Sequence, residues 1–204
     1  FLKGVDDYLN GRNTVAALTA AAAANPGGAA AQYALARKYA ERYDYPAMAA
    51  SYRKVLDLDP GNTLGHREEA EYQLAMAAFR SDKNPVPLTD FVSHYPKSEM
   101  TRGAVSTLTR HHLKVKDGEA ARKVFDQYIA AFPSDHGLMN NYAWNCAETK
   151  QNREHASSVA AKVVTLAPGS DEKAMYLDTG AAVAFAQEKV DEAIALERQA
   201  LDLL

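Results

Sequence analysis

Five prolines recur at a nearly constant interval along the chain. They are Pro26, Pro60, Pro96, Pro133 and Pro168, which gives spacings of 34, 36, 37 and 35 residues. Each follows an apolar run, such as SYRKVLDLDP or VFDQYIAAFP, and precedes small or polar residues. Proline cannot continue a helix, but it fits the turn just after one. The interval therefore predicts an array of similar units that each end at a proline.

Each interval holds two helical patterns separated by a short polar break. In residues 29–62, Leu35 and Ala36 share one face of the first pattern, and Met48 and Tyr52 share one face of the second. No stretch alternates apolar and polar residues long enough to predict a strand, and helix-favouring residues are abundant. The chain is therefore predicted to be all-α. We expect helices near 1–9, 12–24, 28–42, 45–58, 62–80, 86–95, 98–115, 118–131, 135–149, 153–166, 171–187 and 190–203.

This pattern resembles the tetratricopeptide repeat, or TPR. Residues 29–62 supply the large–small pair of that repeat at Leu35 and Ala36, its aromatic residue at Tyr52 and its closing proline at Pro60. Later units match at Leu108, Thr109, Ala121, Phe125 and Pro133, at Tyr142, Ala143, Ala156, Ala160 and Val163, and at Ala181, Ala193 and Ala200. The resemblance implies a TPR-like α-solenoid, a right-handed superhelix of about six antiparallel helix pairs. We expect 1–204 to form one such domain.

The chain gives few signs of where it works. It begins at Phe1 without an initiator methionine and ends in a run that still reads as helix, so we expect a fragment of a longer protein. The compartment, bacterial periplasm or cytoplasm, is therefore left open. No apolar run approaches the roughly 20 residues of a membrane span, so no membrane insertion is expected. A net charge of −3 gives no strong field for nucleic acid, which is not an expected partner.

The run NNYAWNCAE, residues 140–148, has the residue types of a nucleophilic site. It holds the single Cys and the single Trp of the chain. A nucleophilic Cys needs a thiolate-favouring setting and a base within reach. In the repeat register Cys146 points between the two helices of its pair, and His155 lies in the next helix. We interpret Cys146 as a buried structural thiol and predict no catalytic residue and no enzyme activity.

Metal and cofactor motifs are also missing from the sequence. The six histidines do not follow the i, i+3 or i+4 spacing of helical metal sites, and His111 and His112 are adjacent. Gly27 and Gly28 follow Pro26 in a turn rather than in a phosphate-binding loop. We expect no metal and no cofactor.

The concave surface of the array is the remaining candidate site. In TPR proteins the first helix of each pair lines this surface, and extended peptides commonly bind there. Aromatic, Arg and Asn side chains suit such recognition, because they combine apolar contact with directed hydrogen bonds. By register, the resemblance assigns the groove to Tyr33, Arg37, Glu41, Thr107, Arg110, Lys114, Asn140, Asn141, Trp144, Glu148, Asp178 and Phe185. The alternative for Trp144 is packing against the neighbouring repeat.

A narrower resemblance covers roughly the last 70 residues. The runs NNYAWNCAE and YLDTGAAVAF are similar to the C-terminal TPR region of bacterial thioredoxin-fold proteins. The CxxC motif of a thioredoxin domain is not in this chain, so no redox activity is assigned to these residues.

Three functional hypotheses follow from these features. The favoured one is a protein–protein interaction scaffold that binds a partner peptide or helix in its concave groove. The alternative is an accessory TPR region of a thioredoxin-like redox or cell-envelope protein whose catalytic domain lies outside this chain. A third is self-association through the C-terminal helix pair, which no capping helix follows.

Overall fold

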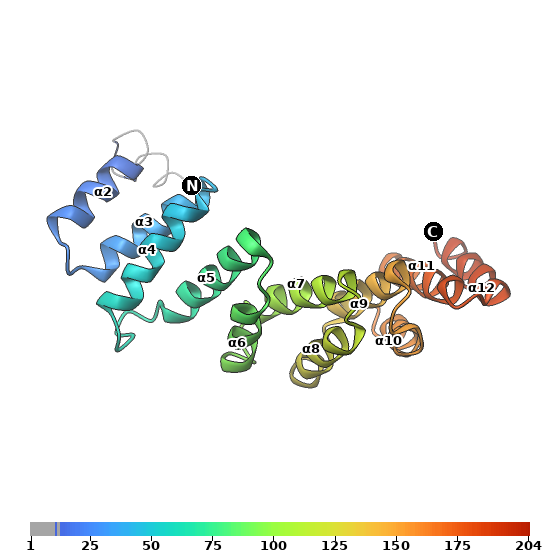
Figure 1. Ribbon diagram of the computed structural model, residues 1–204. Coiled ribbons are helices and arrows are strands. Elements are labelled where there is room, and N and C mark those ends of the chain that lie inside the picture. Colours follow the sequence, from blue (N-terminus) through green and yellow to red (C-terminus); the bar gives the residue numbers. More distant parts are fainter. Residues whose placement is uncertain (1–10, 12) are drawn as a thin grey trace. The chain divides into compact units, whose positions relative to one another are not determined.

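The computed structural model describes residue 11 and residues 13–204, and every regular element in this part of the chain is a helix (Figure 1). The helix predicted at 1–9 lies outside the described residues. The helices are α2 (Val15–Ala24), α3 (Ala29–Glu41), α4 (Tyr45–Leu58), α5 (Arg67–Asp82), α6 (Val86–His94), α7 (Thr101–Lys114), α8 (Gly118–Ala131), α9 (His136–Thr149), α10 (Arg153–Thr165), α11 (Ser170–Ala186) and α12 (Val190–Leu201). The all-α prediction is confirmed.

Polar side chains cap the starts of several helices. The carboxylate oxygens of Asp44, Asp117 and Asp135 each accept a hydrogen bond from the backbone N–H three residues later, at 3.1, 3.0 and 2.9 Å. An Asp at this position satisfies a backbone donor that the first turn of a helix leaves unpaired. These caps place α4, α8 and α9 within one residue of their predicted starts.

The predicted start of α5 at residue 62 is wrong, because the helix begins at Arg67. The Asp59 carboxylate accepts hydrogen bonds from the backbone N–H of Thr63 at 2.8 Å and of Leu64 at 2.9 Å. Asn62 adopts a left-handed conformation with φ of 53°. These bonds hold residues 59–66 as a structured loop, so the apolar pattern overstated the length of the helix.

Contacts divide the chain into two compact units, one up to Phe91 and one from Val92 onward. The prediction of a single domain stays a prediction, and each unit is described by itself. In the first unit α3 packs against α2 and α4, and α4 packs against α5. Its core includes Ala36, Met48 and Tyr52, three residues that the repeat register assigned to the seam between helices.

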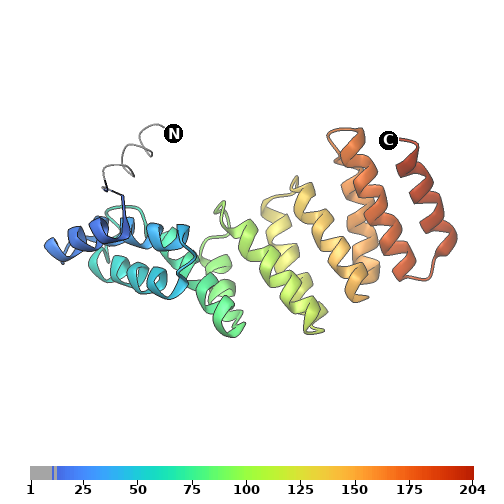
Figure 2. The same cartoon turned by 90° about the horizontal axis from the view of Figure 1, so that it is seen from above.

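The second unit contains three helix pairs, α7 with α8, α9 with α10, and α11 with α12. The first helices, α7, α9 and α11, contact one another in a row, and α8 and α10 lie on one side of that row (Figures 1 and 2). The small residues of the register are buried where paired helices approach, at Ala143, Ala156 and Ala181. The Phe125 ring of α8 stacks on the Tyr142 ring of α9 at 3.9 Å between centroids. The predicted TPR-like pairing is therefore confirmed in this unit.

Candidate functional site

An apolar pocket of about 460 Å³ opens between α9, α11 and α12 in the second unit. Trp144 of α9 and Phe185 of α11 form part of its rim, with 39% and 68% of their surfaces exposed. Ala181, Ala182 and Ala193 also line the pocket. Alanine side chains are short, so they leave space beside them. Ala181 and Ala193 also occupy the small-residue positions of the register, at which α11 and α12 approach closely. The repeat register thus produces both the close helix pairing and the hollow beside it.

Two carboxylates line the same pocket. Asp178 of α11 and Glu197 of α12 share a hydrogen bond. Burial raises the pKa of Glu197, and the hydrogen bond with Asp178 and its negative charge raise this pKa further. Within the described part of the chain, neither carboxylate makes an ion pair. A cation from a bound partner would therefore find two acceptors next to an apolar surface.

Three of the predicted groove residues, Trp144, Asp178 and Phe185, meet in this pocket. The α12 side of the pocket was not predicted, because the register assigned recognition to first helices alone. Val190, Ile194 and Leu201 of α12 also line it. The signal that could have found them was the recurrence of Val190, Ile194 and Leu201 at helical spacing, outside the small-residue positions of the register.

The other predicted residues of the second unit do not line this pocket. Arg110 and Lys114 of α7 and Asn141 and Glu148 of α9 are exposed, as predicted for a contact surface. The hydroxyl of Thr107 donates to the carbonyl oxygen of Gly103 within its own helix at 2.9 Å.

Asn140 is 9% exposed, so it is not an open groove residue. Its Oδ1 has no hydrogen-bond partner among the described residues. An unpaired buried amide oxygen carries a desolvation cost of roughly 1–3 kcal/mol. Asn140 is therefore covered by its surroundings and is not open to a partner.

The predicted groove residues of the first unit make local contacts. The Tyr33 hydroxyl donates to Glu69 at 2.6 Å, and the Tyr52 hydroxyl donates to the other oxygen of the same carboxylate at 2.8 Å. The Arg37 guanidinium lies 6.0 Å from the centroid of the Tyr33 ring. Glu41 pairs with Lys38 at 2.5 Å. Tyr33 thus joins α3 to α5, while Arg37 and Glu41 remain exposed.

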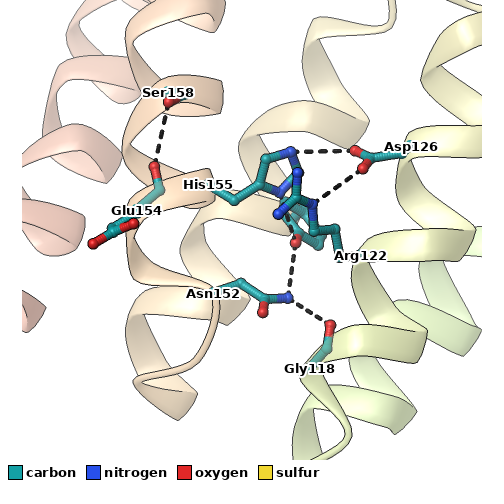
Figure 3. A network of polar contacts seen from close by, with 8 residues as sticks. Gly118, Arg122, Asp126, Asn152, Glu154, His155 and Ser158 are labelled. Atoms are coloured by element: carbon teal, nitrogen blue, oxygen red, sulfur yellow. Dashed lines mark hydrogen bonds and ion pairs between the residues drawn. The ribbon is translucent and has the colours of Figure 1, made fainter.

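A polar network between α8, α9 and α10 was missed from the sequence (Figure 3). His155 Nε2 lies 3.2 Å from an Asp126 oxygen, and His155 Nδ1 lies 3.0 Å from the Tyr142 hydroxyl. Asn152 donates to the same hydroxyl at 3.0 Å and to the Gly118 carbonyl oxygen at 2.7 Å. The network ties two helix pairs together.

Cys146 lies beside this network but is fully buried. Burial raises the pKa of its thiol to about 12, and a hydrogen bond with the Tyr142 hydroxyl only partly opposes that rise. His155 bonds to Tyr142 and Asp126 and not to the thiol. The predicted burial of Cys146 is confirmed, and its setting favours the neutral thiol over a nucleophilic thiolate.

The described residues lack the features of a metal site and of a membrane span. They contain no group of three or more His, Cys, Asp or Glu side chains placed to hold a metal ion. None of their helices combines the length and apolar character that crossing a membrane requires.

Comparison with known proteins identifies the fold. No protein-family model and no curated protein matches the sequence. The MamA protein superimposes with a TM-score of 0.65 at 17% identity, covering 86% of this chain and 91% of MamA. YrrB, described as a TPR protein with an unusual peptide-binding site, gives 0.61 at 17% identity and covers 93% of each chain. A tetratricopeptide repeat protein from Parabacteroides merdae gives 0.54 at 16% identity, covering 98% of this chain and 75% of that one.

These likenesses establish the tetratricopeptide-repeat fold and no more, because the identities are low. They confirm the TPR resemblance inferred from the proline interval. The narrower resemblance to thioredoxin-fold proteins is not supported by these comparisons and remains a prediction.

Proposed function

We propose that this chain is a non-catalytic protein–protein interaction scaffold, and that the pocket between α9, α11 and α12 receives a segment of a partner protein. The observation that carries the proposal is the meeting of Trp144, Asp178 and Phe185 in one apolar pocket. All three were assigned to recognition by register alone. Exposed aromatic residues around a hollow are typical anchors of binding surfaces.

The chemistry of the pocket favours a particular kind of segment. Its aromatic and alanine lining suits a large apolar side chain, which would gain by leaving water. Asp178 and Glu197 outnumber Arg198, the one cation of the pocket lining, so a Lys or Arg beside that apolar residue would be favoured. A peptide or helix carrying an apolar residue next to a basic one therefore fits best.

A solved structure with the same fold gives modest further support. YrrB is described as having a peptide-binding site, which illustrates that this fold can serve peptide recognition. The alternative of an accessory region beside a thioredoxin-like domain rests on the NNYAWNCAE run and remains a separate prediction.

The single tryptophan makes the proposal directly testable, since any change in the intrinsic tryptophan signal reports on Trp144. Peptides would be selected from a random phage-displayed library on the whole chain and then titrated while tryptophan fluorescence is recorded. We expect the selected peptides to carry an aromatic or Leu residue next to Lys or Arg. Binding should shift the emission to the blue, because Trp144 loses contact with water.

Substitutions in the pocket and outside it complete this test. Trp144→Ala and Phe185→Ser should weaken the selected peptides by about tenfold or more, measured by calorimetry. Far-UV circular dichroism should stay unchanged. Met175→Ala is the matched control, because Met175 is also on α11, is 50% exposed and does not line the pocket. Unchanged affinity in both pocket variants would refute the site, and loss of helix in Trp144→Ala would make Trp144 a packing residue.

A further inference from the structure

Four exposed residues follow one face of α12 along the edge of the pocket. They are Ile194, Glu197, Arg198 and Leu201, called the α12 stripe below. Ile194 is 47% exposed and Leu201 is 68% exposed. Their i, i+3, i+4, i+7 spacing places them within about 100° of the helix circumference. Together with Trp144, Phe185 and Val190, these two apolar residues form an exposed apolar patch around one pocket, and contiguous exposed apolar patches mark interaction sites.

The equivalent face of earlier helix pairs is covered by the next helix. Tyr52 of α4 bonds to Glu69 of α5 at 2.8 Å, and Phe125 of α8 stacks on Tyr142 of α9 at 3.9 Å. Glu197 has the corresponding place in α12, because it lies four residues after Ala193 as Phe125 lies four residues after Ala121. This face of α12 therefore corresponds to the surface of α4 and α8 on which the next helix packs.

The α12 stripe is complementary to itself. It reads apolar, acidic, basic, apolar, and the pattern inverts about a point between Glu197 and Arg198. If two copies of α12 pack antiparallel about a two-fold axis at that point, Ile194 of one copy faces Leu201 of the other. The same axis sets Glu197 of each copy opposite Arg198 of the other. Apolar groups then meet apolar groups, and opposite charges meet.

We propose that two copies of this chain associate through an antiparallel, two-fold symmetric pairing of their α12 stripes, with Arg198 of each copy bonded to Glu197 of the other. This pairing does not require the proposed peptide binding, and it would compete with it, because all four stripe residues also line the pocket.

The charges available on this face support a second copy as the occupant. Asp178 and Glu197 bond to each other, and no cation pairs with them in the described part of the chain. The Arg198 side chain likewise makes no ion pair there. Pairing two stripes gives each carboxylate pair a guanidinium and removes Ile194 and Leu201 from water. Because one helix face is small beside the roughly 800 Å² per partner of a standard interface, the dimer should be reversible and should depend on concentration.

Charge reversal at two adjacent positions tests the pairing on the whole chain. Sedimentation velocity over a concentration series should show wild type passing from monomer to dimer. Glu197→Arg sets Arg against Arg across the axis, and Arg198→Glu sets Glu against Glu. Each single variant should therefore dimerise more than about tenfold more weakly. The double variant E197R/R198E restores opposite charges and should dimerise as wild type does.

A mixture of the two single variants gives the sharpest result. One variant carries two Arg residues and the other carries two Glu residues at the centre of the stripe, so an equimolar mixture should form a heterodimer although neither variant dimerises alone. Gln199→Glu changes the charge on the opposite side of the same helix and should leave the wild-type dimer intact. Circular dichroism should be unchanged in every variant, since the substituted side chains are exposed.

Three results would contradict the proposed dimer. A wild-type chain that stays monomeric at every concentration would overturn the proposal, whatever else covers this face. Dimers that persist in both single variants would place the interface elsewhere, and a mixture that fails to combine would exclude the antiparallel register. These results rest on mass and not on Trp144 fluorescence, so failure of the dimer and failure of peptide binding would be seen separately.

Discussion

The donors and acceptors around the Tyr142 hydroxyl favour the neutral form of His155. Asn152 donates to the hydroxyl at 3.0 Å, so the hydroxyl is free to donate its own proton to His155 Nδ1. The Nε2–H of the ring then points at Asp126. A second proton on the ring would turn Nδ1 into a donor, so the hydroxyl could no longer donate its proton to the ring. The hydrogen bonds and the burial of the ring therefore both oppose protonation.

We accordingly predict a loss of stability as the pH falls through the titration range of His155. Burial lowers the pKa of His155, the nearby Asp126 raises it, and Arg122 lowers it again, with a net downward shift. The unfolded chain therefore binds more protons than the folded one below the ordinary histidine pKa of about 6.5. The free energy of unfolding should drop between about pH 6.5 and the lower folded pKa, and then stop falling on account of this residue.

The measurement is urea unfolding of wild type and of His155→Gln between about pH 7.5 and 5.5. The variant should be less stable at the upper end but should show a smaller slope with pH. Burial also lowers the pKa of His112, so His112→Gln should remove a separate part of the slope. Equal slopes in wild type and His155→Gln would contradict the prediction.

The burial of Cys146 predicts an unreactive thiol. Its side chain is fully buried, and burial raises its pKa to about 12. Only the thiolate reacts with disulfide reagents, so reaction in the native protein must wait for local or global opening. Labelling with an aromatic disulfide at neutral pH should be slower by at least about a hundredfold in buffer than in urea. Rapid labelling of the folded chain would show that the thiol is accessible.

The sequence predicted which residues are buried between paired helices, but not which residues of the first helices are exposed. Spacing correctly identified buried positions such as Cys146 and Ala156, because the repeat period fixes which side of a helix meets its partner. It could not say which neighbour a residue on the first-helix row would meet. Tyr33 bonds to Glu69 from α5, and Asn140 is covered, because the side chains of adjacent helices decide exposure on that row.

At the scale of elements, the turns inside the helix pairs share a strained residue. Tyr43, Lys116, Lys150 and Glu188 have positive φ values of 59°, 67°, 56° and 67°. This conformation reverses the chain within a few residues and is one that residues with a Cβ rarely adopt. The sequence offered no glycine at these positions, so the turns could be located between helices but their conformation could not be predicted.

Glu188 allows this strain to be measured. Its side chain makes no hydrogen bond or ion pair in the described structure, and its backbone N–H donates to the Phe185 carbonyl oxygen at 2.9 Å. Glu188→Gly should stabilise the fold by about 0.5–1 kcal/mol, because relief of the left-handed strain exceeds the entropy that glycine adds to the unfolded chain. Glu188→Ala keeps a Cβ and should give no such gain. Urea midpoints would compare the three proteins, and a destabilised glycine variant would refute the argument.

The helix ends show which bounds could be predicted from the sequence and which could not. The proline interval and the helical periodicity placed α4, α6 and α8 close to their observed bounds, since a proline follows the end of each of these helices. The start of α5 was misplaced because the Asp59 carboxylate organises a loop through backbone hydrogen bonds. Such loops depend on one side chain reaching several donors, which periodicity does not encode.

At the scale of the whole molecule, burial is unevenly distributed among the repeats. Of the residues in α2, Ala22 alone is buried, and that helix is composed entirely of Val, Ala, Leu and Thr. In α9 seven residues are buried, and most of them belong to the largest cluster of the second unit. Repeat arrays gain stability from each repeat and from its contacts with neighbours, so local stability should follow this burial.

Amide hydrogen exchange followed by mass spectrometry would test the gradient in the intact chain. After correction for intrinsic rates, amides of α2 should exchange fastest and those of α9 slowest, by several powers of ten, because α9 opens only when its packed neighbours also open. α2 has 10 residues and α9 has 14, so the difference cannot come from helix length alone. In urea both segments should exchange at their intrinsic rates. Equal protection of α2 and α9 would mean that the array unfolds as one cooperative body and that burial does not set local stability.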